Sequence, residues 1–177
     1  NKINWIPESI GKGRFGDWLE NIQDWGLSRN RYWGTPLNIW ECECGERHAV
    51  GSIKELKEMS DDCPENIELH RPFIDAVTIR CPKCGKKMHR VPEVIDCWFD
   101  SGSTHVAAMQ RDQGFWPADM YIEGGDQYRG WFQSSLLVAV GALGKGAPYR
   151  ECLTHGWTVD GEGKAMHKSL GNGMDPA

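Results

Sequence analysis

Side chains that could bind a ligand or take part in catalysis are concentrated in two stretches, each of which contains a glycine turn. Tyr121 to Trp131 reads Tyr-Ile-Glu-Gly-Gly-Asp-Gln-Tyr-Arg-Gly-Trp and carries two carboxylates, an amide and a guanidinium around a turn. Gly163 to Asn172 reads Gly-Lys-Ala-Met-His-Lys-Ser-Leu-Gly-Asn, and its two lysines, imidazole and hydroxyl suit the binding of phosphate. Together the two stretches predict a nucleotide site at the carboxyl end of a parallel sheet.

A second kind of chemistry lies in two close pairs of cysteines, each followed by a glycine. Zinc takes four thiolates in tetrahedral geometry, and two short turns that each donate two sulfurs supply that geometry. Four protein ligands leave no open coordination position, so such a metal would hold the module together and not catalyse. The alternative is a set of unconnected core thiols. The predicted structural zinc ligands are Cys42, Cys44, Cys81 and Cys84.

Regular elements must position the first stretch. Met120 to Ile122 is a short predicted strand, a helix is expected from Asp126 to about Leu143, and a further strand from Leu153 to Val159. Strand, glycine turn, helix and strand form the right-handed crossover of a doubly wound α/β sheet. The ligand crevice of such a sheet lies at the carboxyl ends of its strands.

Three polar side chains emerge at that edge, namely Glu123, Asp126 and Gln127. They could bind ribose hydroxyls or an amine there, and the adjoining Gly124-Gly125 allows a ligand to approach the backbone. A helix cap is the plainer interpretation of the two carboxylates. We favour the ligand site because of its location.

Regular elements must also position the two cysteine pairs. A strand over Leu37 to Trp40 leads to the first pair, and the capping box that begins at Ser52 predicts a helix over Ile53 to Met59. The alternation over Ile74 to Arg80 predicts a strand into the second pair, with Met88 to Val91 returning as its hairpin partner.

The remaining segments carry weaker signals. Apolar spacing predicts a helix from Phe15 to Trp25, stopped by Gly26. Ser28 to Pro36 holds two arginines and is either a solvated turn or a contact for an anionic ligand or an RNA backbone. A strand from Val94 runs into a turn where Asp100 or Ser101 would cap a helix. Trp98 in that turn is either core or pocket wall.

Composition limits the class of protein. The 177 residues can bury one sizeable core and a small satellite module. The formal charge of −5 disfavours a chain that grips nucleic acid by bulk electrostatics. The longest apolar run, Leu136 to Leu143, is too short to span a bilayer, and there is no secretion signal, so we expect a cytoplasmic protein without a membrane partner.

Four motifs, taken together, closely resemble the isoleucyl-tRNA synthetases, which are class I aminoacyl-tRNA synthetases. They are Leu27 to Pro36, Asp96 to Gly102, Glu123 to Phe132 and Met166 to Asn172. The likeness covers nearly the whole chain. It implies the second half of a Rossmann-like α/β catalytic domain with a small zinc-ribbon β insertion. The implied parts are a helical lead-in at 1–36, the zinc ribbon at 37–93 and the C-terminal half of the catalytic domain at 94–177.

The resemblance also implies residue roles. Trp98 and Trp131 would wall the aliphatic amino-acid pocket, and Gln127 would hold the substrate's amino group. The aminoacyl-adenylate would further contact Glu123, Gly124 and Asp126. The residues implied to lie at ATP are His155, Gly156, Lys164, Met166, Lys168 and Ser169. Lys168 is the implied catalytic residue, since it matches the second lysine of the signature Lys-Met-Ser-Lys-Ser and would stabilise the triphosphate in the transition state.

The implied activity belongs to the parent protein, a monomer that activates isoleucine with ATP and Mg²⁺ and transfers it to tRNA(Ile). Two signature positions differ, because Ala165 replaces the first lysine and His167 the first serine. The family's His-Ile-Gly-His type motif is missing from this chain, and so are the editing insertion and the anticodon-binding region. We therefore expect this fragment to be inactive alone. The alternative is a non-catalytic zinc-ribbon module that binds RNA or another protein.

Overall fold

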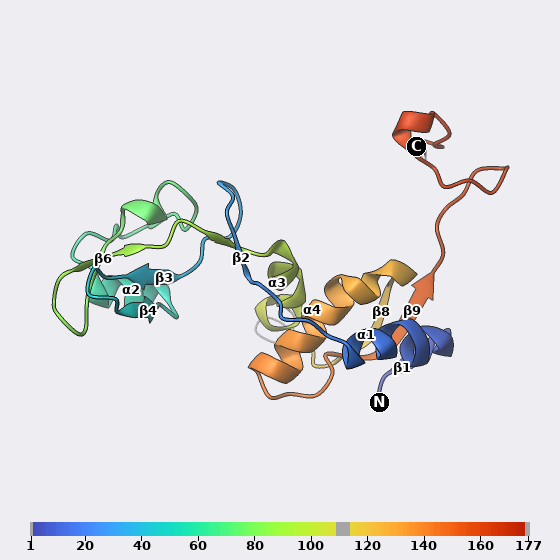
Figure 1. Cartoon of the computed structure of the whole chain (residues 1–177), viewed down its shortest axis with the longest axis horizontal. Helices are drawn as coiled ribbons and strands as arrows, with labels where there is room; N and C mark the ends of the chain where they lie inside the picture. The colour runs from blue at the N-terminus through green and yellow to red at the C-terminus, as the bar shows by residue number, and fades with distance from the viewer. Residues whose placement is uncertain (1, 109–113, 176–177) are drawn as a thin grey trace. The chain divides into compact units, whose positions relative to one another are not determined.

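The computed structural model describes residues 2–108 and 114–175. The chain divides into two compact units (Figure 1). We call Asn1–Gln23 with Ser101–Ala177 the parallel-sheet unit, and Asp24–Asp100 the cysteine unit. Across the described ranges no helix is both long and apolar enough to pass through a bilayer.

The parallel-sheet unit contains three strands, β1 (Asn4–Ile6), β8 (Ala118–Gly124) and β9 (Tyr149–His155). Their order is β1-β9-β8, and both pairings are parallel. Parallel neighbours need a crossover connection, and the helical segment between β8 and β9 supplies it. The predicted mixed α/β fold with a parallel sheet is confirmed, and β9 begins four residues before the predicted strand.

The crossover is not the single helix expected from Asp126 to Leu143. It consists of η4 (Gly125–Arg129), α4 (Trp131–Leu137) and a π-helical segment, η5 (Val138–Ala142). The break falls at Gly130, whose φ of −119° and ψ of −134° lie outside the helical region. The expected helix is therefore divided at the end of the polar stretch.

The helix expected from Phe15 to Trp25 is also shorter than predicted. A π-helical segment, η1 (Ile10–Phe15), leads into α1 (Gly16–Glu20). Asn21 ends α1, and its side-chain Nδ2 donates to the carbonyl of Asp17 at 2.9 Å. Trp25 matched the helical spacing but lies in the cysteine unit, where its indole N–H donates to Asp96 at 2.8 Å.

Aromatic side chains dominate the core of the parallel-sheet unit. The indole ring of Trp5 packs against Phe15 at a centroid distance of 5.0 Å, and Tyr121 stacks on Trp131 at 4.1 Å. The buried cluster comprises Trp5, Phe15, Ala118, Tyr121, Phe132, Tyr149 and Cys152. This core fixes the strands whose ends carry the polar stretch.

The cysteine unit is built on a four-stranded antiparallel sheet of order β4-β3-β6-β5. The strands are β3 (Ile39–Glu41), β4 (Arg47–Ala49), β5 (Ile79–Arg80) and β6 (Lys87–Arg90). The predicted hairpin of β5 and β6 is confirmed. A separate antiparallel pair joins β2 (Ser28–Arg29) to β7 (Val94–Ile95).

The predicted helix over Ile53–Met59, α2, is confirmed. The Ser52 hydroxyl accepts from the Glu55 N–H at 3.1 Å, and the Glu55 carboxylate accepts from the Gly51 N–H at 2.7 Å. The second bond differs from an ordinary capping box, in which the glutamate would reach the N–H of Ser52.

Two other expectations in this unit are wrong in detail. The strand predicted over Ile74 to Arg80 is only β5, because its first part is η2 (Ile74–Ala76), where Asp75 is held by Arg71 and Arg90. The helix α3 (Cys97–Gly102) starts before Asp100, since the Asp96 carboxylate caps it by accepting from the Trp98 N–H at 3.2 Å.

Candidate functional site

Four cysteines from two turns meet in the cysteine unit. Cys42 and Cys44 follow β3, and Cys81 and Cys84 follow β5. Each turn closes at a glycine in the left-handed region, Gly45 at φ +83° and Gly85 at φ +74°. The Gly45 N–H donates to the Cys42 carbonyl and the Gly85 N–H to the Cys81 carbonyl, each at 2.9 Å. The two spacings, CxC and CxxC, therefore form comparable turns.

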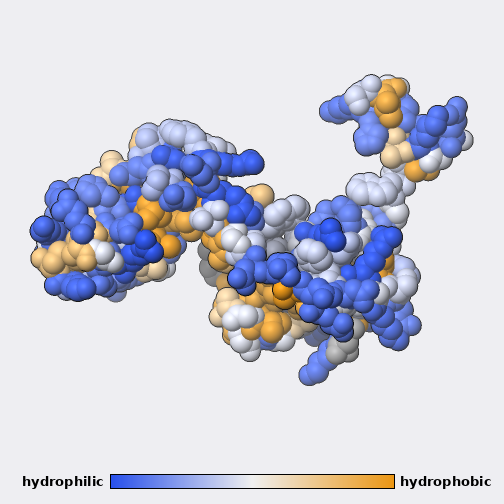
Figure 2. Space-filling model, viewed as in Figure 1, coloured by the Kyte–Doolittle hydropathy of each residue, from blue (hydrophilic) through white to orange (hydrophobic). Residues whose placement is uncertain are grey.

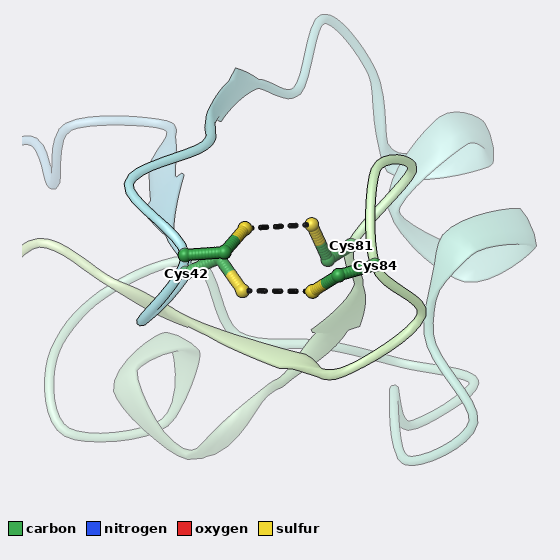
Figure 3. A group of neighbouring side chains, drawn as sticks. Cys42, Cys81 and Cys84 are labelled. Atoms are coloured by element: carbon green, nitrogen blue, oxygen red, sulfur yellow. Dashed lines mark hydrogen bonds between the residues drawn. The ribbon is translucent and has the colours of Figure 1, made fainter.

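The four sulfurs converge on one point (Figure 3). Cys42 Sγ lies 3.5 Å from Cys84 Sγ, and Cys44 Sγ lies 3.8 Å from Cys81 Sγ. All four lie within 4.8 Å of one another. Tetrahedral zinc with bonds of roughly 2.3 Å sets its sulfurs about 3.8 Å apart, so the cluster has the size and donors of a four-thiolate metal site.

The thiols of this cluster differ in acidity. Burial raises the pKa of Cys81, but the backbone N–H groups of Cys84 and Lys83 and the neighbouring thiols lower it to about 7. A backbone hydrogen bond from Cys44 lowers the pKa of Cys42, while burial and the surrounding thiols raise it to about 12. A bound cation would favour the thiolate at all four positions.

The second candidate site is a cavity of about 450 Å³ in the parallel-sheet unit. It lies where β1, β8 and β9 end, since Gly124 pairs with His155 at the last register position of the sheet. The cavity is lined by Pro7, Ile10, Arg14, Gly125, Asp126, Tyr128, Thr154, His155, Gly156 and Trp157. Three predicted site residues therefore share one cavity: Asp126, His155 and Gly156.

Gln127 and Gly124 describe the local geometry of the turn after β8. Gln127 Oε1 is buried and has no hydrogen-bond partner within residues 2–108 and 114–175. A buried acceptor without a donor is costly, and a bound N–H or ammonium group would satisfy it. A Cβ at Gly124 would lie 2.6 Å from Asp126 Oδ1, so only glycine lets that carboxylate fold back over the strand end.

The two predicted pocket tryptophans fall in different units. Trp131 is half-buried and stacked on Tyr121 in the parallel-sheet unit. Trp98 lies in the cysteine unit, in the first turn of α3, and the residue is 43% exposed. Their joint role as pocket walls stays a prediction. Glu123 is half-buried at the end of β8.

We call residues 159–172, which include the predicted phosphate-binding stretch Gly163 to Asn172, the lysine loop. It starts with a hairpin in which Val159 bridges Ala165. Lys164 Nζ pairs with the Glu162 carboxylate at 2.7 Å. Lys168 starts a short helix, η6 (Lys168–Leu170), and its ammonium group has no ion-pair partner among the residues that the structure describes. Met166 is half-buried and Ser169 is exposed. Among the described residues, the loop thus presents the Lys168 ammonium group without an ion pair, and the Ser169 hydroxyl follows it in the chain.

Sequence reasoning missed three residues near these sites. Arg14 comes from η1, lines the same cavity as Asp126, and lacks a charged partner in the described part of the chain. Asp160 and Asn172 organise the lysine loop through their side chains. Arg14 stands in an irregular glycine-rich segment without a recognisable motif, whereas the Asp-Gly-Glu-Gly turn was a signal for Asp160.

A further cavity of about 380 Å³ lies within the cysteine unit. Apolar side chains such as Leu37, Trp40, Val50 and Leu56 line most of it. None of the predicted site residues contributes to its lining. It therefore adds nothing to the chemistry of the two sites above.

The family model for class I tRNA synthetases (I, L, M and V) matches residues 1–177, so the chain belongs to this family. Isoleucine–tRNA ligases of Clostridium tetani and Clostridium novyi are 51% and 52% identical over 183 residues, which cover 99% of this chain. Isoleucine–tRNA ligase 2 of Bacillus thuringiensis is 49% identical over 98% of this chain. The chain spans 18% of the length of each of these relatives.

One solved structure shares the fold. It is the ternary complex of the Agrobacterium radiobacter K84 agnB2 LeuRS with tRNA and LeuAMS. The likeness has a TM-score of 0.63 and 24% sequence identity, and it covers 92% of this chain and 24% of that one. This agreement concerns the fold alone.

Proposed function

We propose that this chain forms the adenylate-binding part of an isoleucine–tRNA ligase, a cytoplasmic monomer that activates isoleucine with ATP and transfers it to tRNA(Ile). The observation that carries the proposal is Gln127 Oε1, which is buried and has no hydrogen-bond partner among the described residues. Gln127 follows directly in the chain on Asp126, which lines the cavity together with His155. An amino-acid ammonium group is the kind of donor that this acceptor needs. The identity of the relatives supports isoleucine as the amino acid.

In the proposed reaction an isoleucine carboxylate oxygen bonds to the α-phosphorus of ATP, and the bond to the bridging oxygen breaks to release pyrophosphate. Gln127 accepts from the ammonium group, and Glu123 and Asp126 bind polar groups of the amino acid and ribose, with the Gly124 backbone beside them. On the family resemblance, Trp98 and Trp131 are each proposed to contact the aliphatic side chain. This division places apolar walls around the side chain and polar groups around the rest.

The lysine loop acts on the phosphates. Lys168 stabilises the charge that develops on the triphosphate as the bond breaks, and a Mg²⁺ ion that enters with ATP supplies further positive charge. Lys164, Met166 and Ser169 complete the loop's contact with ATP, while His155 and Gly156 contact it from the end of β9. Lys168 is suited to this role because its ammonium group has no ion pair within the described residues.

The four cysteines are proposed to hold one structural zinc ion. Their sulfur separations and thiolate chemistry fit that metal, and a closed four-ligand set has no position for substrate. The metal then contributes to the folding of the cysteine unit and takes no part in the transfer. The three-part division at 1–36, 37–93 and 94–177 is proposed on the same family basis.

The test uses a full-length chimera in which this chain replaces the matching residues of the Clostridium tetani enzyme. We expect isoleucine-dependent pyrophosphate exchange from the chimera and none from the isolated chain, which carries no His-Ile-Gly-His type motif. Gln127→Ala should reduce exchange at least about tenfold, the effect of one lost charged hydrogen bond. Gln23→Ala, an exposed glutamine of the same unit, is the matched control.

Robust exchange from the isolated chain would contradict the expected inactivity. Equal exchange from the chimera and its Gln127→Ala variant would contradict the site. Absence of exchange in the chimera, together with RNA or protein binding by the isolated chain, would favour the non-catalytic zinc-ribbon module instead.

A further inference from the structure

The lysine loop has an internal support that its signature does not include. Residues 156–175 contain no buried side chain, and Leu170 and Met174 are 65% and 81% exposed. Figure 2 shows this C-terminal segment as largely hydrophilic, with only small apolar areas. A segment without a hydrophobic core must hold its conformation by other means, and here hydrogen bonds supply them.

Asp160 and Asn172 make those bonds from opposite ends of the loop. Asp160 Oδ1 accepts from the N–H groups of Glu162 at 3.0 Å and Lys164 at 2.9 Å. Asp160 Oδ2 accepts from Asn172 Nδ2 at 2.7 Å, which joins the two side chains. These donors lower the pKa of Asp160, chiefly the Asn172 amide and the Lys164 N–H, so the carboxylate is charged at neutral pH.

Asn172 then reaches the middle of the loop. Its Oδ1 accepts from the His167 N–H at 2.9 Å, and its Nδ2 also donates to the Ala165 carbonyl at 3.2 Å. Ala165 and His167 are the two positions that depart from the Lys-Met-Ser-Lys-Ser signature. The Asn172 side chain binds the backbone N–H of His167 and the backbone carbonyl of Ala165. These bonds therefore do not depend on the side chains at positions 165 and 167.

The held backbone leads directly into Lys168. His167 precedes η6 with extended dihedral angles, φ −136° and ψ 137°. Gly171 ends η6 in the left-handed region at φ 65°, and its N–H donates to the Lys168 carbonyl at 3.2 Å. Fixing the His167 N–H therefore fixes the start of the helical turn that carries Lys168.

We propose that Asp160 and Asn172 are positioning residues that hold Lys168 in place through the backbone of the lysine loop, which lets positions 165 and 167 differ from the signature. The part that concerns catalysis rests on the proposed function of Lys168. The part that concerns loop conformation stands on the hydrogen bonds alone.

The first test measures amide hydrogen exchange in the 177-residue chain by NMR. In Asn172→Ala the His167 N–H loses its acceptor, and we expect it to exchange about tenfold faster, as for a lost bond of average strength. Glu162→Gln is the matched control, because the only hydrogen bond found for its carboxylate, among the described residues, is to the exposed Lys164 ammonium. Unchanged exchange at His167 in Asn172→Ala overturns the proposal.

The second test exchanges the two residues. In the Asp160→Asn, Asn172→Asp double variant the amide at 160 can still accept from the N–H groups of Glu162 and Lys164 and donate to the carboxylate at 172. That carboxylate can accept from the His167 N–H, so only the bond to Ala165 is lost. We expect exchange rates near those of the original chain, and rates as fast as in Asn172→Ala contradict the pairing.

The third test measures pyrophosphate exchange in the full-length chimera. Misplacing Lys168 affects charge that develops only in the transition state, so Asn172→Ala should lower kcat about tenfold with little change in the KM for ATP. The double variant should recover most of the kcat. An unchanged kcat in Asn172→Ala overturns the positioning role. No exchange in the unsubstituted chimera instead contradicts the proposed function, while the amide exchange rates still decide the loop contacts.

Discussion

The two units differ in whether their polar and charged groups have partners within the protein. In the cysteine unit they are satisfied internally, as the four converging thiols and the fully buried Arg90 side chain show. In the parallel-sheet unit the buried Gln127 Oε1 lacks a partner within the described residues, and Lys168 lacks an ion pair. The first pattern is typical of a structural module and the second of a site that awaits a ligand.

Arg90 shows how complete the internal pairing is. Its guanidinium donates to the carbonyls of Leu37 at 3.1 Å and Glu93 at 2.9 Å, and it forms a salt bridge with Asp75. Asp75 also accepts from Arg71 at 2.7 Å. A ligand has no unsatisfied group to bind here, so changes in this network should affect stability and not recognition.

The largest expected effect is the loss of the metal. Cys81→Ser should remove zinc from the chain and unfold the cysteine unit, because metal binding supplies about 10–16 kcal/mol in small zinc modules. Metal content by mass spectrometry and near-ultraviolet circular dichroism measure the two outcomes. Cys97→Ser changes an exposed thiol outside the cluster and should retain one zinc per chain. Full zinc content in Cys81→Ser would contradict the four-cysteine site.

The buried ion pair comes next. Asp75→Asn leaves the buried Arg90 charge without its carboxylate and should destabilise the cysteine unit by about 3–5 kcal/mol in urea unfolding. Asp61→Asn is the matched control, since Asp61 pairs with Arg80 at 3.4 Å on an exposed surface, where a pair contributes roughly 0–1 kcal/mol. Equal losses in the two variants would remove the distinction between buried and exposed pairs.

In the parallel-sheet unit, loss of the Lys168 charge should lower the rate of pyrophosphate exchange and leave the stability of the fold unchanged. Lys168→Ala in the full-length chimera should lower the kcat of isoleucine-dependent pyrophosphate exchange about 100-fold, the usual effect of removing one transition-state charge contact. The urea midpoint should stay unchanged, because the side chain is exposed and has no ion pair in the described structure. A large fall in stability with an unchanged kcat would indicate that Lys168 has a structural role and not a role in the reaction.

The smallest effect concerns pH. Burial raises the pKa of Asp96, but hydrogen bonds from Trp25 and Trp98 and the charge of Arg29 outweigh it and lower the pKa below its usual value. The lowered pKa contributes to the free energy of unfolding above pH roughly 3.9, the pKa of an aspartate in the unfolded chain. This contribution is lost as the pH falls through the pKa of Asp96 in the folded protein. Urea midpoints from pH 7 to pH 3 should fall less in Asp96→Asn than in the original chain. Parallel curves would show that Asp96 contributes nothing.

The cysteine cluster and the sheet edge could be predicted because their signals are local. A pair of cysteines followed by glycine predicts a tight turn whatever surrounds it. The alternation of apolar and polar residues likewise predicts the hairpin of β5 and β6. The strand, glycine turn and crossover likewise placed Asp126 at the carboxyl end of the sheet. Each cysteine turn and the β5–β6 hairpin depend on residues within about a dozen positions of one another.

The errors arose where distant contacts decide the local structure. Trp25 fitted a helix by spacing, yet its indole donates to Asp96, 71 positions away. Asp75 lies in the short helix η2 and not in a strand, and Arg90 of β6 binds its carboxylate from 15 positions away. Periodicity carries no information about such partners, and the same holds for Arg14 and for the side-chain pairing of Asp160 with Asn172.

We propose that the turn after β8 binds the amino-acid end of an isoleucyl-adenylate. Calorimetric titration of the full-length chimera with a non-hydrolysable isoleucyl-adenylate analogue tests it most directly, with Gln127→Ala and the control Gln23→Ala measured beside it. We expect one binding site per chain and a Kd at least about tenfold higher in Gln127→Ala alone, since the charged donor of the ligand loses its buried acceptor. The same Kd in all three proteins would contradict it.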